Sequence, residues 1–322
     1  MGACRRCGNL IGAVLVVPLA VVLAALVEVP TVTPFAWDKV SAEEPAAAVT
    51  RPPAPKDDSF GSGKMFDRIA FAYDLGNRWM SLGLDQFWRQ TLLRECMRLQ
   101  PQDHVLDLAT GTADVALLVG NELRGLVANG TAEGASAAVY GVDPSREMLR
   151  HGVEKVRAAG LEGIVHLHQG DAQDLSNVES VMGAPKVSDG LSSVPSESID
   201  KVSMSFGIRN VPDRAKALRE IARVLKHNER SRACILEFSL PDGSSMLSKV
   251  AQFFIQHLIP FIGKIATLGK GGAEYQYLER SIVDFPAPKD FAAQMTRNGL
   301  AVHNITAFAY GSVQLYSAVV KM

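Results

Sequence analysis

The sequence contains little cysteine, four residues in 322. Cys4 and Cys7 form one C-x-x-C pair without a second pair at zinc-site spacing, while Cys96 and Cys234 stand alone among apolar residues. This distribution argues against a metal framework and against a disulfide framework. We therefore expect buried thiols in a reducing compartment, and no metal site.

Clustered positive charge is also missing. The formal net charge is −1, and no Lys/Arg cluster is interleaved with aromatic residues. Nucleic-acid-binding domains carry such clusters because they neutralise phosphates. The sequence therefore predicts no nucleic-acid partner.

A third absence concerns glycine. The apolar run 105–108 contains Asp107 and leads into a loop in which Gly111 is the only glycine before Gly120. Run, loop and following helical pattern are typical of the first strand, turn and helix of a doubly wound sheet. A dinucleotide site needs G-x-G-x-x-G so that the backbone can approach a pyrophosphate, which makes an NAD-dependent dehydrogenase a weak alternative.

S-adenosylmethionine fits the loop better because it has no phosphates. It needs a close backbone approach, which Gly111 allows, and an acid at the end of the second strand to accept from the ribose hydroxyls. The run 139–143 ends in Asp143, which meets that need. On this stretch alone, a plain strand-to-helix turn of another α/β protein remains an alternative, since a single-glycine loop is a weak motif.

Strand and helix patterns alternate from residue 105 to residue 238, which predicts a mostly parallel sheet with right-handed crossovers. A helix at 290–297 and strands at 300–310 and 312–320 follow. The expected earlier elements are strands at 105–108, 139–143, 164–168, 199–206 and 233–238, and helices at 64–98, 145–159 and 212–226.

Residues 1–60 have the composition of a leader, followed by one domain at 61–322. The leader holds an apolar segment at 10–27 and a Pro/Ala-rich linker, which suits a mitochondrial-type presequence, a membrane anchor or a signal sequence. Within the domain we expect insertions at 125–138 and 176–198, and a helical cover at 245–285 over the substrate. A helix buried against the sheet and a membrane-facing surface are the alternatives for the apolar part of this cover.

Several blocks of the sequence resemble the ubiquinone/menaquinone biosynthesis C-methyltransferases over about residues 60–320. The most specific are Phe66 to Trp88 and Ser205-Phe206-Gly207-Ile208-Arg209-Asn210-Val211, supported by the loop from Asp107 to Asp114, Leu236-Glu237-Phe238-Ser239 and Tyr275-x-Tyr277-Leu278. One departure is Ala113, which stands where many members have a second glycine.

The resemblance implies an α/β class I methyltransferase fold, Rossmann-like, with a seven-stranded sheet and an antiparallel final strand. It implies S-adenosylmethionine as cofactor and C-methylation of a polyprenylated benzoquinol in ubiquinone biosynthesis. It assigns Thr112, Asp143, Asp171, Ala172 and Ser205 to the cofactor, in addition to Asp107 and Gly111, which the strand and its glycine loop already indicated. Arg209, Asn210 and Tyr73 are assigned to the quinol ring.

We expect Arg209 to stabilise a phenolate, since guanidinium stays charged far above neutral pH and is a poor proton acceptor. The alternative is an arginine that only pairs near the start of the next helix, where Asp213 lies close in sequence.

The resemblance also implies the matrix face of the mitochondrial inner membrane, with peripheral membrane contact and other quinone-biosynthesis enzymes as partners. A homodimer is compatible with it. Two alternatives for function stay open: a demethylmenaquinol methyltransferase, and a catalytically inactive nucleotide-binding scaffold within a quinone-biosynthesis complex.

Overall fold

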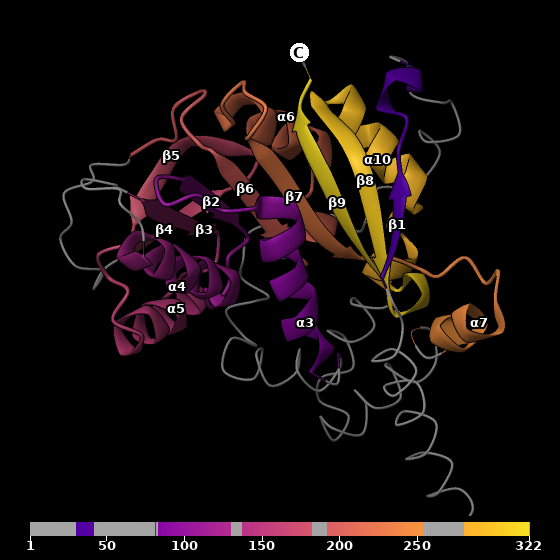
Figure 1. The fold of residues 1–322 in the computed structure, drawn as a ribbon, viewed down its shortest axis with the longest axis horizontal. Helices are drawn as coiled ribbons and strands as arrows, with labels where there is room; N and C mark the ends of the chain where they lie inside the picture. The colour runs from indigo at the N-terminus through magenta and orange to yellow at the C-terminus, as the bar shows by residue number, and fades with distance from the viewer. Residues whose placement is uncertain are drawn as a thin grey trace, which may run out of the picture.

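The computed structural model describes residues 30–41, 81, 83–129, 137–181, 192–253, 255 and 280–321. These residues form one sheet of nine strands in the order β1-β8-β9-β7-β6-β2-β3-β4-β5 (Figure 1). The strands are β1 (Thr31–Pro34), β2 (His104–Leu108), β3 (Ala138–Asp143), β4 (Val165–Asp171), β5 (Asp174–Ser180), β6 (Lys201–Ser205), β7 (Arg232–Phe238), β8 (Leu300–Phe308) and β9 (Val313–Val320).

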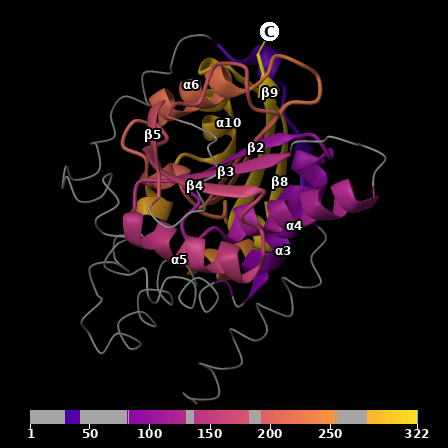
Figure 2. The same ribbon diagram turned by 90° about the vertical axis from the view of Figure 1, so that its left-hand side faces the viewer.

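Helices cover both faces of this sheet. The helices of the described ranges are, in chain order, η1 (Trp37–Lys39), α3 (Leu84–Thr91), the π-helical η3 (Leu92–Met97), α4 (Asp114–Asn129), α5 (Arg146–Ala158), η4 (Ile208–Asn210), α6 (Arg214–Val224), α7 (Met246–Phe253), α10 (Pro288–Arg297) and η6 (Ala309–Gly311). Figures 1 and 2 show α3, α4 and α5 on one face, with α6 and α10 on the other.

The centre of the sheet is parallel. Strands β7, β6, β2, β3 and β4 pair in parallel, and β9 runs antiparallel between β7 and β8. Buried side chains alternate between two cores: Val105 packs on the α3 and α4 face, and Leu106 on the α6 and α10 face. The predicted mostly parallel sheet with an antiparallel final strand is confirmed.

Local sequence explains where the helices begin and end. Ser145 caps α5 by accepting a hydrogen bond from the Met148 amide, and Asp213 caps α6 through the Lys216 amide. Pro288 occupies the first turn of α10, and Gly299, with a φ of 96°, follows its end.

The sheet has nine strands where seven were predicted. One added strand is β1, which lies inside the predicted leader and pairs antiparallel with β8 at the edge. The other is β5, which begins two residues before the predicted 176–198 insertion and extends into it, and which buries Leu175 and Val178 beside β4. Likewise, α4 runs to Asn129 through the start of the predicted 125–138 insertion. The boundary at residue 60 stays a prediction.

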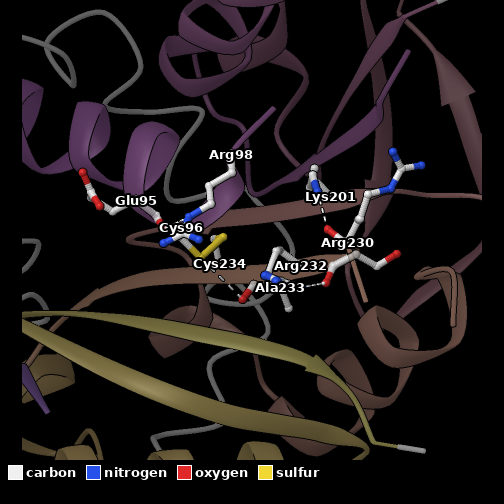
Figure 3. The surroundings of a disulfide bond; sticks show 9 residues. Glu95, Cys96, Arg98, Lys201, Arg230, Arg232, Ala233 and Cys234 are labelled. Atoms are coloured by element: carbon white, nitrogen blue, oxygen red, sulfur yellow. Dashed lines mark hydrogen bonds between the residues drawn. A yellow bond between two sulfur atoms is a disulfide. The ribbon is translucent and has the colours of Figure 1, made fainter. Parts of the chain in front are cut away.

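A disulfide joins Cys96 in η3 to Cys234 in β7, with their Cα atoms 6.0 Å apart (Figure 3). The interpretation of these cysteines as separate buried thiols is therefore wrong. They lie 138 residues apart in sequence, and only the packing of η3 across the sheet brings them together. Both are buried, as the apolar flanks indicated.

Part of the predicted cover, and all of the predicted apolar segment at 10–27, lies outside the described residues. From the cover, α7 is described: it buries Ser248 and Ala251 and exposes Met246, Leu247 and Phe253. Among the described residues, no helix has the length and apolarity to cross a bilayer.

Candidate active site

The candidate site lies where the chain order of the parallel strands reverses, between β2 and β6. Ligands of open α/β sheets bind at this position, outside the carboxyl ends of the strands. The loops after β2 and β6 approach each other closely here: a Cβ added at Gly207 would lie 2.5 Å from the Cβ of Ala109. Only glycine fits at residue 207 without a shift.

The loop after β2 turns through left-handed backbone. Ala109, Gly111 and Ala113 have φ values of 51°, 56° and 68°. No heavy atom of the part of the chain that the structure describes lies within 4 Å of a Cβ added at Gly111, so this part of the loop faces open space that a ligand could approach. Ala113 adopts the conformation that glycine adopts without strain, which explains why a glycine suits that position.

Asp107 holds this loop from below. Its carboxylate accepts hydrogen bonds from Thr110 Oγ1 at 2.6 Å and from Ser203 Oγ at 2.7 Å. Burial raises its pKa to about 6, although both hydroxyls and the charge of Arg89 oppose the rise. Asp107 therefore shapes the loop from beneath, and its two oxygens face protein donors.

Asp143 ends β3 beside the same loop. Its Oδ2 accepts from the Gly111 amide at 2.9 Å, and its Oδ1 accepts from the Ser145 amide at 2.8 Å. Asp143 lies directly against the loop, at the end of the second strand, where an acid could meet the ribose of a cofactor. The structure thus brings Gly111 and Asp143 together, as the sequence predicted.

The other predicted cofactor residues line the same edge of the sheet. Thr112 accepts a hydrogen bond from Lys155 Nζ at 2.8 Å. Asp171 and Ala172 form the tight turn after β4, where Asp171 accepts from the Gln173 amide. Ser205 ends β6, and its buried Oγ has no hydrogen-bond partner among the described residues, which is where a ligand atom could bind.

Arg209 follows β6 in η4, and its side chain is 7% exposed. Its Nη1 donates to Glu237 Oε1 at 2.5 Å and to the Phe206 carbonyl at 2.9 Å. Asp213, the partner considered from sequence, instead caps α6. Asn210 lies beside it and reaches the same Phe206 carbonyl at 3.5 Å, while Tyr73 lies outside the described residues.

An aromatic cluster, which sequence reasoning missed, borders Arg209. The rings of Phe206 and Phe238 lie 4.6 Å apart, and Trp88 from α3 contacts both edge to face. The Arg209 guanidinium lies 5.4 Å from the centre of the Phe238 ring. Phe206 has a φ of 58°, a strained conformation that often marks a functional site.

Sequence reasoning also missed a charged network that links α3 to the cofactor loop. Arg89 donates to Asp85 at 2.9 Å and to Asp114 at 2.8 Å, and Lys155 binds Asp114 and Thr112, each at 2.8 Å. The i, i+4 spacing of Asp85 and Arg89 on one helix is the sequence feature that could have predicted their ion pair.

A cavity of about 1090 Å³ lies elsewhere, between α3–η3 and the sheet face formed by β8 and β9. Arg94, Arg98, Arg232 and His303 are among its lining residues, and none of the predicted site residues that the structure describes lines it. The predicted site therefore rests on the loops at the switch point and not on this cavity.

The sequence matches the ubiE/COQ5 methyltransferase family over residues 56–320. The chain belongs to this family. The ubiquinone/menaquinone biosynthesis C-methyltransferase UbiE of Syntrophotalea carbinolica is 36% identical over 253 residues, covering 79% of this chain and 91% of the relative. A demethylmenaquinone methyltransferase of Bacteroides fragilis is 31% identical, covering 79% and 90%.

The protein is thus an S-adenosylmethionine-dependent C-methyltransferase of quinone biosynthesis with an α/β class I methyltransferase fold. Among solved structures, a SAM-dependent methyltransferase from Aquifex aeolicus aligns with a TM-score of 0.44 and 16% identity, covering 72% of this chain and 89% of that one. That likeness concerns the fold alone.

The residues at the switch point fit the cofactor. Gly111 faces open space in the described structure, Asp143 places a carboxylate beside the Gly111 amide, and the buried Ser205 hydroxyl lacks a partner among the described residues. These are the features that an adenosyl group with a ribose diol and a polar tail requires.

Proposed function

We propose that this protein methylates a ring carbon of a polyprenylated benzoquinol, the precursor of ubiquinone. The observation that carries the proposal is Arg209, whose nearly buried guanidinium lies at the switch point; its Nε is itself buried and has no hydrogen-bond partner among the described residues. Bound S-adenosylmethionine supplies an electrophilic methyl group on its sulfonium. Gly111, Asp143 and Ser205 would hold it in the adjoining loops.

Arg209 can provide the positive charge that an ionised quinol requires. The ring carbon becomes nucleophilic when the neighbouring phenol ionises, and ionising a phenol of pKa about 10 at pH 7 costs about 4 kcal/mol. The Arg209 Nε–H donates to the phenolate oxygen and lowers that cost, while the phenol proton leaves to water. The ring carbon would take the methyl group as the methyl–sulfur bond breaks, the sulfur leaving as a neutral thioether. The ring carbon then loses its hydrogen to water as the oxygen regains a proton, which restores the aromatic ring. Asn210 orients the ring, together with Tyr73 by the family resemblance.

Substitution of Arg209 by lysine tests this role. Lysine keeps the charge opposite Glu237 but loses the planar fork, so Arg209→Lys should lower kcat on a short-tailed benzoquinol at least about tenfold. Raising the pH should restore part of the rate. Alanine is the poorer variant, because an unpaired buried Glu237 would cost about 3–5 kcal/mol of folding stability. Wild-type kcat in Arg209→Lys would remove Arg209 from the chemistry.

The cofactor site has its own test. Asp143→Asn keeps the shape of the side chain but removes the charge that would accept from two ribose hydroxyls, so calorimetry should show S-adenosylmethionine affinity reduced about 10- to 150-fold, from about 1.5–3 kcal/mol. NAD should show no binding to either protein. An affinity equal to the wild type would exclude Asp143 from the site.

Demethylmenaquinol is the second candidate substrate. Relatives from Bacteroides fragilis and Thermotoga maritima, 31% and 33% identical, carry the name demethylmenaquinone methyltransferase. Mass spectrometry of quinone intermediates in cells lacking the protein separates the two: a methoxy-benzoquinol precursor should accumulate under our proposal, and demethylmenaquinone under the alternative.

For location we propose the matrix face of the mitochondrial inner membrane, where a polyprenylated substrate and other quinone-biosynthesis enzymes would be met. The absence of acids before Glu28, together with the Arg5 and Arg6 pair, supports a presequence. Fractionation of a tagged full-length protein tests it. Recovery in the secretory pathway with a cleaved leader would contradict this location.

A further inference from the structure

The carboxylate of Glu237 is buried at the carboxyl end of β7 with an exposure of 0%. β7 lies inside the sheet, between β6 and β9, and so provides a rigid support. A charged group in this position loses its hydration, and it persists only when several donors replace the lost water.

Those donors come mainly from Arg209. Oε1 accepts from Arg209 Nη1 at 2.5 Å and from the Phe238 amide at 2.8 Å, and Oε2 accepts from the Arg209 amide at 3.2 Å. One carboxylate thus fixes both the main chain and the side chain of Arg209. The Phe206 carbonyl takes a further Nη1 hydrogen bond at 2.9 Å, and the Phe238 ring lies against the guanidinium.

We infer that Glu237 is a positioning residue for methyl transfer, aiming the unpartnered Nε of Arg209 at the quinol oxygen; this inference rests on the function proposed for Arg209. Nη1 is occupied by Glu237 and Phe206, so the guanidinium cannot turn without breaking both contacts. A donor fixed in advance stabilises developing charge without the cost of reorienting during the reaction.

Stability alone does not account for the pair. Replacing a buried ion pair by apolar side chains of similar volume is often neutral or stabilising. Tyr316 adds to the cost of this one: its hydroxyl is buried without a partner among the described residues, and burial together with the Glu237 charge raises its pKa. An apolar residue at 237 would remove that conflict, so the retained charge points to a role in the reaction.

The direct test is Glu237→Gln, which keeps the length of the side chain and removes the charge. We expect kcat and kcat/KM for the quinol to fall together, at least about tenfold, as for an interaction made in the transition state. S-adenosylmethionine affinity should stay within about twofold of the wild type. Glu237→Asp, which retracts the carboxylate by one methylene, should also lower kcat and replaces the first variant if that fails to fold.

Asp103→Asn is the matched control. Asp103 and Lys201 form another buried ion pair, with side chains 4% and 3% exposed, at the opposite end of the sheet. Its substitution should change the melting temperature while kcat remains that of the wild type. If kcat falls equally in both variants, loss of a buried charge anywhere slows the enzyme, and the inference is wrong.

A double-mutant cycle with Arg209→Lys decides whether Glu237 acts through Arg209. If it does, the double variant should be no slower than Arg209→Lys alone, within about twofold. Effects that multiply, or wild-type kcat in Glu237→Gln, would overturn the inference while leaving the proposed function intact. Wild-type kcat in Arg209→Lys would instead show that the proposed function fails at Arg209.

Discussion

Asp107 is a buried carboxyl group, and its hydrogen bonds hold the loop after β2 in place. Its hydrogen bonds from Thr110 and Ser203 connect the loop after β2 to β6. The sequence indicated an acid inside a buried strand. It did not indicate that both oxygens would be used by protein hydroxyls, because Ser203 is 96 residues away.

The raised pKa of Asp107 makes stability depend on pH. The pKa rises from 3.8 to about 6 on folding, so the folded protein binds the proton more tightly between these values. Stability from this group is therefore greatest at low pH and falls as pH rises through about 4 to 6, by about 3 kcal/mol for about two pKa units. Asp107→Asn should lose this component.

The measurement is the free energy of unfolding of wild type and Asp107→Asn across pH 4 to 7. Their difference should change within the window from about 4 to 6 and become constant above it. A difference that stays constant throughout would show that Asp107 is not held at a raised pKa. Comparing the two proteins cancels the titration of the remaining carboxyl groups.

At the scale of elements, α3 is tied to the cofactor loop through Arg89. This arginine is 7% exposed and pairs with Asp85 on its own helix and with Asp114 at the start of α4. Lys155 extends the network from α5. Because α3 also contributes Trp88 to the aromatic cluster at Arg209, the network joins the two halves of the site.

Arg89→Met should uncouple α3 from the loop. The loss leaves the buried Asp85 carboxylate without its cation, at a cost of about 3–5 kcal/mol of folding stability, and S-adenosylmethionine affinity should fall as the loop loosens. Arg150→Met is the control, since its ion pair with Glu147 is exposed, 67% and 46%, and should cost under about 0.5 kcal/mol. Equal melting temperatures for the two variants would contradict the network.

Sequence predicted the elements with strong periodicity and missed those without it. α5, α6 and α10 carry caps and apolar faces that can be read from neighbouring residues, and they were predicted within a few residues. β1 could not be predicted from the sequence, because its four residues are all exposed and the strand is held by pairing with β8. β5 has two buried residues in a polar stretch, a pattern that depends on β4 beside it.

The same limit applies to the site. Gly111 and Asp143 follow successive strands, so a parallel sheet brings them together, and the sequence could predict their proximity. Arg209 and Glu237 were both within recognised motifs, yet their pairing depends on how η4 turns back over β7. An ion pair that depends on loop geometry produces no periodic pattern in the sequence from which it could be predicted.

On the scale of the whole molecule, the Cys96–Cys234 disulfide links two residues that are 138 positions apart in the sequence. It fixes η3 against β7, between the helical layer and the centre of the sheet (Figure 3). The crosslink encloses most of the cofactor half, since β2 to β6 all lie between its two cysteines in sequence.

Removing this crosslink should lower stability considerably. Its two cysteines are 138 residues apart, and closing a loop of about that length restricts the unfolded chain by about 4–5 kcal/mol. At about 2–4 °C per kcal/mol for a chain of this size, reduction should lower the melting temperature by roughly 10 °C or more. Cys96→Ala/Cys234→Ala should melt at a similarly low temperature and show no response to reductant, because it lacks the bond.

Peptide mapping without reduction should recover residues 96 and 234 in one linked fragment. Two free thiols at these positions, with a melting temperature that reductant leaves unchanged, would mean that the cysteines are unlinked in solution.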